Sequence, residues 1–357
     1  MESIRLIFKQ FNLKGTFESA CRYGSGHINE TFLIHTKEEG SPGYILQKIN
    51  SNVFGDIPKM LGNIAQVTDY LNIHFPKSHN LQLFRSFEGN HYVIDRNLQY
   101  WSAYNFIDGV SYDVLINEKQ ALEGGKAWGS FLLQLIDFPS QKLHITLTGF
   151  HNLQLRLKQF YEALKTGNHQ RVYKNIALID FIRKHEYKML DYQHKLFNSN
   201  IPLRITHNDT KFNNILFDTN DNFLCIIDLG TIMTGYIHYD FGDAIRTVCN
   251  TSTEDEDNLQ KINFNLPFFK AFSQGYLMHT KQFLLEQEVE YLPLSPLFMT
   301  YMIGLRFFTD YLQNDQYFKI RYQEHNLQRA KVQFKLFNEM KKNSEVMEQI
   351  IKQIIHN

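Results

Sequence analysis

The sequence contains little cysteine, no net charge and no long apolar run. Its three cysteines, at positions 21, 225 and 249, lie far apart and form no CxxC pair. They are too few for a disulfide framework or a thiolate metal site. The 37 Lys and Arg residues balance the 37 Asp and Glu residues. We therefore expect no overall field that would hold the protein on nucleic acid or on an anionic bilayer.

Signals for secretion and for membrane insertion are also missing. The first twenty residues contain no apolar stretch of signal-peptide length and no small-residue cleavage pattern. The most apolar long stretch, residues 292–308, contains Pro293, Pro296 and Arg306 and falls short of roughly 20 uninterrupted apolar residues. We expect a cytoplasmic protein that binds neither a membrane nor nucleic acid. The sequence leaves the oligomeric state open, and a monomer is compatible with it.

Aromatic side chains, in contrast, are abundant. The 30 Phe, 19 Tyr and 2 Trp residues, in a chain that is 43 % apolar, supply the area for a large buried core. A working value of roughly 150 residues per domain predicts about two domains or lobes for the 357 residues.

The first hundred residues predict a small antiparallel sheet with one helix, and the rest of the chain predicts long helices. Strand-like runs occupy residues 32–34, 44–49, 91–94 and 99–104, and apolar side chains recur at helical intervals over residues 58–73. Further helices are expected at residues 118–136, 153–166, 176–198, 268–285, 297–313 and 330–355. Two short strand-like runs, at residues 203–205 and 223–227, interrupt them. The expected fold is α+β, with an N-terminal lobe of residues 1–104 and a larger, mainly helical lobe of residues 105–357.

The strongest chemical signal is the pattern H-x-D-x-x-x-x-N at residues 207–214, followed by D-x-G at residues 228–230. Phosphoryl transfer from a nucleotide requires a carboxylate that orients the attacking hydroxyl, and oxygen ligands for Mg²⁺. Asp209 fits the first role, and Asn214 and Asp228 fit the second. Asn, Asp and Thr also cluster in ordinary turns, but the two elements together predict a catalytic magnesium site.

Two neighbours of Asp209 have alternative interpretations. We expect His207 to hydrogen-bond the loop rather than to act as a general base. Lys211 is expected to neutralise the transferring phosphate, and the alternative is a merely exposed lysine.

A glycine-containing turn occurs between the first strand-like runs. Gly24, Ser25 and Gly26 offer backbone N–H groups that can approach triphosphate oxygens, although a plain hairpin is the alternative. A cation from the neighbouring strand usually assists such binding. Here Gln47 stands at that position, and strand alternation points Lys48 to the opposite face.

Arg306 is a charged residue in an otherwise apolar helix, with Asp310 four residues further on. An unpaired buried guanidinium is costly, so Arg306 must meet a carboxylate or a ligand. The sequence leaves open whether that partner is Asp310 or a substrate.

At these motifs the sequence resembles the aminoglycoside phosphotransferase family of small-molecule kinases, and within it the N-acetylhexosamine 1-kinases. The resemblance extends over residues 23–32, 44–50, 201–216, 226–235, 240–246 and 306–318. It implies a bilobal, protein-kinase-like fold. It also implies an enzyme that uses ATP and Mg²⁺ to phosphorylate the anomeric hydroxyl of N-acetylglucosamine or N-acetylgalactosamine, so that its partners are a nucleotide and a small sugar.

The resemblance also implies roles for individual residues. Asp209 corresponds to the catalytic carboxylate, and Asn214 and Asp228 correspond to the metal ligands. Gln47 takes the position of the lysine in the nucleotide site. The hinge segment that recognises adenine corresponds to Tyr104, Asn105, Phe106 and Ile107. The sugar pocket corresponds to His27, Asp209, Thr231, Arg306 and Tyr317. Two positions depart from the family pattern, because Gly230 and Ala65 stand where acidic residues are expected.

Two other functions stay open at this stage. One is a kinase of the same fold for another hydroxyl acceptor, such as an aminoglycoside, homoserine or choline. A polycationic aminoglycoside favours an acidic cleft and choline an aromatic cage, whereas His27, Arg306 and Tyr317 suit sugar hydroxyls. The other is a nucleotide-binding regulator without catalysis, against which the combination of Asp209, Asn214 and Asp228 argues. The preference between the gluco and galacto epimers is not predicted.

Overall fold

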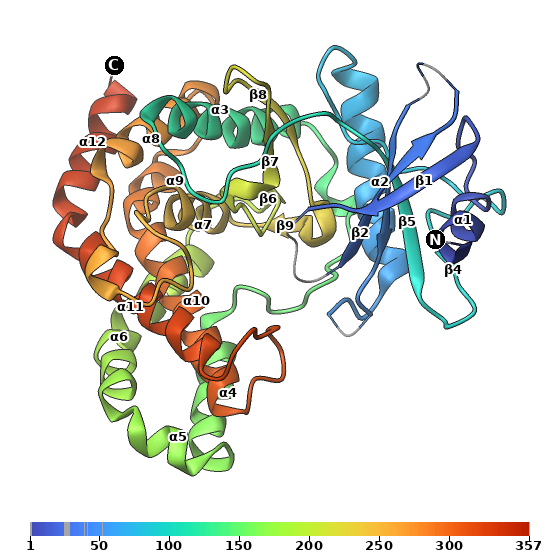
Figure 1. Ribbon diagram of the computed structural model, residues 1–357. Coiled ribbons are helices and arrows are strands. Elements are labelled where there is room, and N and C mark those ends of the chain that lie inside the picture. Colours follow the sequence, from blue (N-terminus) through green and yellow to red (C-terminus); the bar gives the residue numbers. More distant parts are fainter. Residues whose placement is uncertain (1, 25–28, 39, 41, 52, 357) are drawn as a thin grey trace. The chain divides into compact units, whose positions relative to one another are not determined.

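The computed structural model describes residues 2–24, 29–38, 40, 42–51 and 53–356 (Figure 1). The chain divides into two compact units. The first consists of Met1–Val110, Gln134–Thr148 and Leu216–Thr234, and the second of Ser111–Leu133, Gly149–Ile215 and Gly235–Asn357. The lobe boundary expected after residue 104 stays a prediction.

The first unit is built on an antiparallel sheet of five strands in the order β1-β2-β3-β5-β4. The strands are β1 (Phe17–Arg22), β2 (Glu30–Thr36), β3 (Tyr44–Lys48), β4 (Val93–Ile94) and β5 (Tyr100–Asn105). Four of them lie where the sequence predicted strand-like runs. Strand β1 and the N-terminal helix α1 (Glu2–Phe8) were not predicted. The apolar side chains of α1 complete one core of this sheet together with Tyr44, Leu46 and Trp101.

Helix α2 (Ile57–His74) is the helix predicted over residues 58–73. Its buried side chains include Met60, Leu61, Ile64, Val67 and Leu71, which recur at helical spacing. Its buried Asn63 donates to the carbonyl oxygens of His144 (2.8 Å) and Ile232 (3.0 Å). Helix α2 thereby fixes the segment that follows Asp228 within the same unit. The remaining short elements of this part of the chain are η1 (Ser140–Lys142), β7 (Ile215–Phe217), β8 (Phe223–Ile226), η3 (Leu229–Thr231) and β9 (Met233–Gly235).

The second unit is mainly helical, as the sequence predicted. Its longer helices are α3 (Glu118–Gln134), α4 (Leu153–Thr166), α6 (Ile176–Asn198), α7 (Ile237–Val248), α8 (Leu266–Thr280), α10 (Ser295–Leu312), α11 (His325–Lys342) and α12 (Ser344–His356). Its short elements are α5 (His169–Lys174), β6 (Arg204–Thr206), η2 (Phe212–Asn214), η4 (Leu259–Lys261), α9 (Glu286–Tyr291) and η5 (Leu292–Leu294). The mixed α+β class, with an antiparallel-sheet part and a helical part, is confirmed.

The helix expected over residues 330–355 is in fact two helices, α11 and α12, with Asn343 between them. The Asn343 amide donates to the carbonyl oxygen of Glu339 (2.9 Å), and the Ser344 hydroxyl donates to that of Lys341 (2.9 Å). These side chains compete with the backbone hydrogen bonds of a continuous helix. The apolar spacing alone does not reveal such a break.

Helices α3 and α8 approach each other closely at glycines. A Cβ atom on Gly125 would lie 2.0 Å from the carbonyl oxygen of Phe272, and one on Gly129 would lie 2.6 Å from that of Tyr276. The lack of a side chain at these two positions, four residues apart, lets the backbone of α8 approach α3 closely. No helix in the described part of the chain combines the length and the apolar character that a membrane span requires.

Candidate active site

The loop that carries Asp209 follows strand β6 and is held in place by Asp240 of α7. The backbone N–H of His207 donates to Asp240 Oδ2 (2.7 Å) and that of Asn208 donates to Oδ1 (2.8 Å). The Thr210 hydroxyl donates to the Asp240 carbonyl oxygen (2.6 Å). Backbone N–H groups beyond the end of a strand need acceptors when they are buried, and one carboxylate supplies two of them here.

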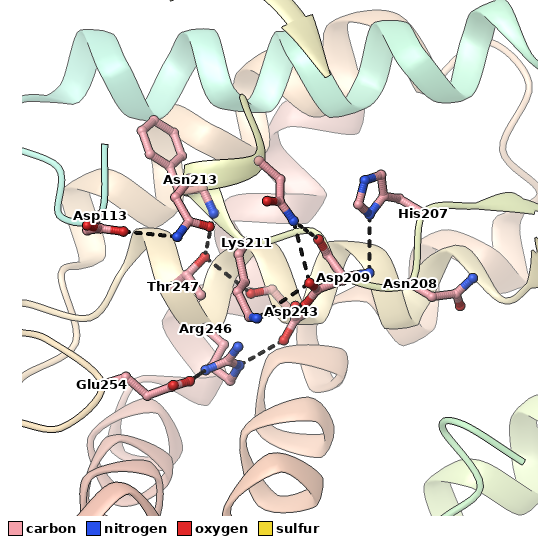
Figure 2. A network of polar contacts seen from close by, with 12 residues as sticks. Asp113, His207, Asn208, Asp209, Lys211, Asn213, Asp243, Arg246, Thr247 and Glu254 are labelled. Atoms are coloured by element: carbon pink, nitrogen blue, oxygen red, sulfur yellow. Dashed lines mark hydrogen bonds and ion pairs between the residues drawn. The ribbon is translucent and has the colours of Figure 1, made fainter. Parts of the chain in front are cut away.

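Asp209, Lys211 and Asn214 lie together in the second unit. Figure 2 shows Lys211 beside Asp209. Lys211 Nζ is 3.2 Å from Asp209 Oδ1, and the Asn214 amide donates to the Asp209 carbonyl oxygen (2.8 Å). The Asp209 side chain is 24 % exposed, so a substrate can reach its carboxylate. The Asn214 amide oxygen accepts no hydrogen bond from any residue that the structure describes. It is therefore available to a ligand such as a cation.

The charges around Asp209 keep it ionised. Removal from water raises the pKa of Asp209, but the Lys211 ammonium, His207 and Arg246 more than offset this effect, and its pKa is lowered. The nearby Asp209 carboxylate in turn raises the pKa of Lys211. At neutral pH the site therefore presents a carboxylate that can orient a hydroxyl, beside a cation that can meet a phosphoryl group.

His207 is buried and acts on the loop itself. Its ring contacts Trp128 edge to face, with centroids 4.9 Å apart, and its Nδ1 accepts from the Asp209 N–H (3.3 Å). This arrangement fits a histidine that fixes the loop rather than a general base.

A buried ion cluster on α7 was assigned no role from the sequence. Arg246, whose side chain is 3 % exposed, donates through Nε to Asp243 (2.8 Å) and through Nη1 to Glu254 (3.1 Å). Figure 2 places this cluster next to Lys211 and Asp209. The detectable signal was the spacing of Asp240, Asp243 and Arg246, three residues apart, which puts three charges on one face of an apolar helix.

Arg306 lies among aromatic rings and not against Asp310. Its guanidinium carbon is 5.0 Å from the ring centroid of Phe150, 5.7 Å from that of Tyr317 and 5.4 Å from that of Phe318. No carboxylate among the described residues lies within 4.0 Å of the guanidinium. The structure therefore contradicts an internal pair with Asp310 and brings together the two predicted sugar residues Arg306 and Tyr317.

Asp310 has a different role, because it organises the loop after α10. Its carboxylate accepts the backbone N–H groups of Gln316 (2.9 Å), Tyr317 (2.7 Å) and Phe318 (2.9 Å), and also the Asn326 amide (3.0 Å). Burial raises the pKa of Asp310. The carboxylate thus positions two of the three rings that surround Arg306.

The first unit contains the residues predicted to bind the phosphates. Gly24, in the connection between β1 and β2, adopts a left-handed conformation (φ +76°) that suits glycine. Ser25, Gly26 and His27 lie outside the described residues. Gln47 faces Thr31 across the sheet, and its amide is 3.5 Å from the Thr31 hydroxyl. Lys48 instead pairs with Glu30 (3.1 Å), in agreement with the expected alternation.

The predicted hinge residues continue from β5. Tyr104 is buried, and Asn105 is anchored because its Oδ1 accepts from the Gln82 N–H (2.7 Å). The Phe106 N–H donates to the Gly43 carbonyl oxygen (3.0 Å). The next N–H, that of Ile107, has no acceptor among the described residues and is available to an adenine ring.

The D-x-G motif lies at η3 of the first unit. Asp228 adopts a left-handed backbone conformation (φ +59°), and Thr231 ends the 3₁₀ turn. Burial raises the pKa of Tyr104, and the Asp228 carboxylate adds to this effect, so these two predicted residues lie within electrostatic reach. A Cβ atom on Gly230 would lie 3.3 Å from the ring of Phe54 and 3.7 Å from Asp228 Oδ1. An acidic side chain at this position would crowd that ring.

The second departure, Ala65, is buried on α2. The one charged side chain of β3, Lys48, pairs with Glu30 of β2. Among the described residues, therefore, no ion pair joins β3 to α2.

Comparisons with known proteins agree with this architecture. The sequence model of the phosphotransferase enzyme family (APH) matches residues 19–276. The structure of a microcompartment-associated aminopropanol kinase is similar with a TM-score of 0.68 at 12 % identity, over 97 % of this chain and 98 % of that chain. Amicoumacin kinase in complex with AMP-PNP and Ca²⁺ gives 0.58 at 12 % identity, over 98 % and 90 %. Choline kinase from Cryptosporidium parvum gives 0.54 at 18 % identity, over 95 % and 93 %. These similarities establish the fold, and the match over most of the sequence establishes that the chain belongs to the phosphotransferase enzyme family.

Proposed function

We propose that the protein is an ATP- and Mg²⁺-dependent kinase that phosphorylates the anomeric hydroxyl of an N-acetylhexosamine. The observation that carries the proposal is the grouping of an ionised, partly exposed Asp209 with Lys211 and with the free amide oxygen of Asn214. Family membership supports the reaction class. The resemblance to N-acetylhexosamine 1-kinases supports the acceptor.

Asp209 is the residue to which we assign the acceptor hydroxyl. Its carboxylate orients the hydroxyl and accepts its proton as the bond to phosphorus forms. Lys211 offsets the negative charge of the phosphoryl group during transfer. Because direct in-line transfer needs positioning rather than a covalent intermediate, the rigid support of the loop by Asp240 favours it.

Asn214 and Asp228 are the residues that we assign to Mg²⁺. When bound, Mg²⁺ neutralises the charge of the nucleotide phosphates. The described residues contain no group of three or more His, Cys, Asp or Glu side chains that could hold a metal ion. A site with two protein oxygens suits Mg²⁺, which takes its other ligands from phosphates and water.

For the nucleotide, we assign adenine to the hinge and the phosphates to the first β-hairpin. The unused N–H of Ile107 is a suitable donor to the adenine edge, with Tyr104, Asn105 and Phe106 around it. Gly24, Ser25, Gly26 and Gln47 are the assigned phosphate neighbours. The complex of amicoumacin kinase with AMP-PNP and Ca²⁺ supports a nucleotide with a divalent cation.

For the acceptor, we assign the sugar to Arg306 and Tyr317, with His27 and Thr231 as further contacts. The rings around Arg306 hold the guanidinium while leaving its N–H groups for sugar hydroxyls and the acetamido oxygen. Aminopropanol kinase and choline kinase, which share the fold, are named after acceptors that are not sugars. Such acceptors are the alternative.

The test is an ADP-release assay with a panel of acceptors, in which NMR reads the position of the new phosphate. We expect N-acetylhexosamines to be the best acceptors and the phosphate to appear on the anomeric oxygen. Asp209→Asn should lower turnover by about three orders of magnitude or more while nucleotide binding persists. Asp180→Asn, at an exposed position on α6, is the matched control and should leave turnover unchanged. Near-normal turnover by Asp209→Asn would reject the catalytic assignment, and a clear preference for choline or an aminoglycoside would reject the acceptor.

A further inference from the structure

A second guanidinium, that of Arg156, lies close to Arg306. Arg156 is in the first turns of α4, which packs against α10 and therefore against the helix of Arg306 (Figure 1). It donates through Nη2 to the carbonyl oxygen of Phe150 (2.9 Å), and Phe150 is also the ring nearest to the Arg306 guanidinium. Burial and the charge of Arg306 lower the pKa of Arg156 to about 10. The two cations are thus close enough to repel each other.

No counter-ion balances this pair of guanidinium groups within the part of the chain that the structure describes. Neither Arg156 nor Arg306 has a carboxylate within 4.0 Å, and the other partner of Arg156 is the neutral amide of Gln159 (3.0 Å). The Arg156 Nε atom is buried and has no acceptor in the same residues. Asp310 directs its carboxylate to the amides of the loop after α10. Two adjacent cations without counter-ions are costly. We therefore expect a ligand to place electron-rich oxygen atoms against them.

His151, which the charges of both Arg306 and Asp209 reach, does not cancel the charge of this pair. The buried His151 ring hydrogen-bonds the Asn208 carbonyl oxygen (3.1 Å). Burial and the charge of Arg306 lower the pKa of His151 to about 3, so the ring is neutral at neutral pH. The negative charge of Asp209 is balanced by Lys211.

We propose that Arg156 and Arg306 together form a charge filter in the acceptor subsite, which binds neutral or anionic acceptors through their oxygens and rejects acceptors that carry an ammonium group. Arg156 is a specificity-determining residue in this arrangement. The inference rests on the proposed kinase function, because it assumes that the acceptor binds at Arg306. It adds a prediction about specificity, namely that this protein, unlike kinases whose acceptors are amines, does not use acceptors with an ammonium group.

The experiment compares glucose, which has a hydroxyl at carbon 2, with glucosamine, which has an ammonium group there. The wild-type protein should use glucose at least about tenfold better in kcat/KM, since one close like-charge contact is worth about that much at a partly buried site. The preference should shrink at high salt and at high pH, where the amine loses its proton. Arg156→Gln should lower the ratio of kcat/KM for glucose to kcat/KM for glucosamine by about fivefold or more, mainly because kcat/KM for glucosamine rises. Lys158→Gln removes a cation at an exposed position of the same helix and should leave the ratio unchanged.

Several results would overturn the charge filter. They are a wild-type preference for glucosamine over glucose, a ratio that does not respond to salt or pH, and a ratio unchanged in folded Arg156→Gln. The salt and pH measurements use only the wild-type protein, so they decide the matter even if that variant does not fold. If no sugar is phosphorylated, the proposed function fails separately. The filter is then tested with choline and its uncharged isostere 3,3-dimethylbutanol, and a preference for choline would reject it.

Discussion

Replacing Gly125 by alanine should destabilise the second unit by about 2 kcal/mol or more. The new methyl group would lie 2.0 Å from the Phe272 carbonyl oxygen and 2.8 Å from the Tyr276 nitrogen, both of which are backbone atoms of α8. No change of rotamer can relieve that overlap, so α3 and α8 must separate. Overpacking costs about 1–3 kcal/mol and sometimes more, and we expect the upper end of that range. The better helix propensity of alanine returns about 1 kcal/mol.

Gly62 on α2 provides the matched control. A Cβ atom there has no neighbour within 4 Å, so Gly62→Ala should stabilise the first unit by about 0.5–1 kcal/mol. The two tryptophans separate the readouts in a urea titration, because Trp101 is in β5 of the first unit and Trp128 is in α3 of the second. Each glycine variant is compared with its parent in a background that keeps one tryptophan and replaces the other by phenylalanine. An unchanged or raised midpoint for Gly125→Ala, or an equal loss for Gly62→Ala, would refute the steric argument.

Three further variants test the electrostatics and the acceptor subsite. Because burial lowers the pKa of His151 from 6.5 to about 3, its neutral ring contributes stability above pH 6.5 that is lost as the pH falls below that value. His151→Gln should therefore reduce the difference in unfolding free energy between pH 7 and pH 5 by about 2 kcal/mol, measured by urea titration, and an unchanged difference would contradict the burial of a neutral ring. Arg306→Ala should raise KM for the acceptor by about tenfold or more with little change in KM for ATP, and equal changes would indicate a structural role. Asp310→Ala releases the loop that carries Tyr317, so KM for the acceptor should again rise by about tenfold while kcat changes less, whereas a pure loss of kcat would contradict that role.

Local sequence patterns predicted much of the fold. The structure places α4 at Leu153–Thr166 and α6 at Ile176–Asn198, the same residues that apolar spacing predicted, because each of these helices buries one face. The grouping of Asp209 and Asn214 was also predictable, since they lie five positions apart in one loop and local geometry brings them together.

Features that depend on tertiary contacts were not predictable. The local sequence does not predict that Asp240 accepts hydrogen bonds from two N–H groups of a loop some thirty residues earlier. It also does not predict the ion pair between Arg246 and Glu254. The spacing of Arg306 and Asp310 favours a helical ion pair. The structure uses Asp310 for the amides of the next loop instead, because those amides have no other acceptor. Competition among partners decides such cases, and a single sequence does not reveal the competitors.

The support that Asp240 gives to residues 207–210 has a consequence for transferring this loop to another protein. The loop depends for its shape on a carboxylate that a helix supplies from outside the loop. A graft of residues 204–214 alone would therefore lose its conformation in a new scaffold. A portable unit must include at least the first turns of α7 with the loop, and a design that copies the motif needs an acidic residue placed to accept the same N–H groups.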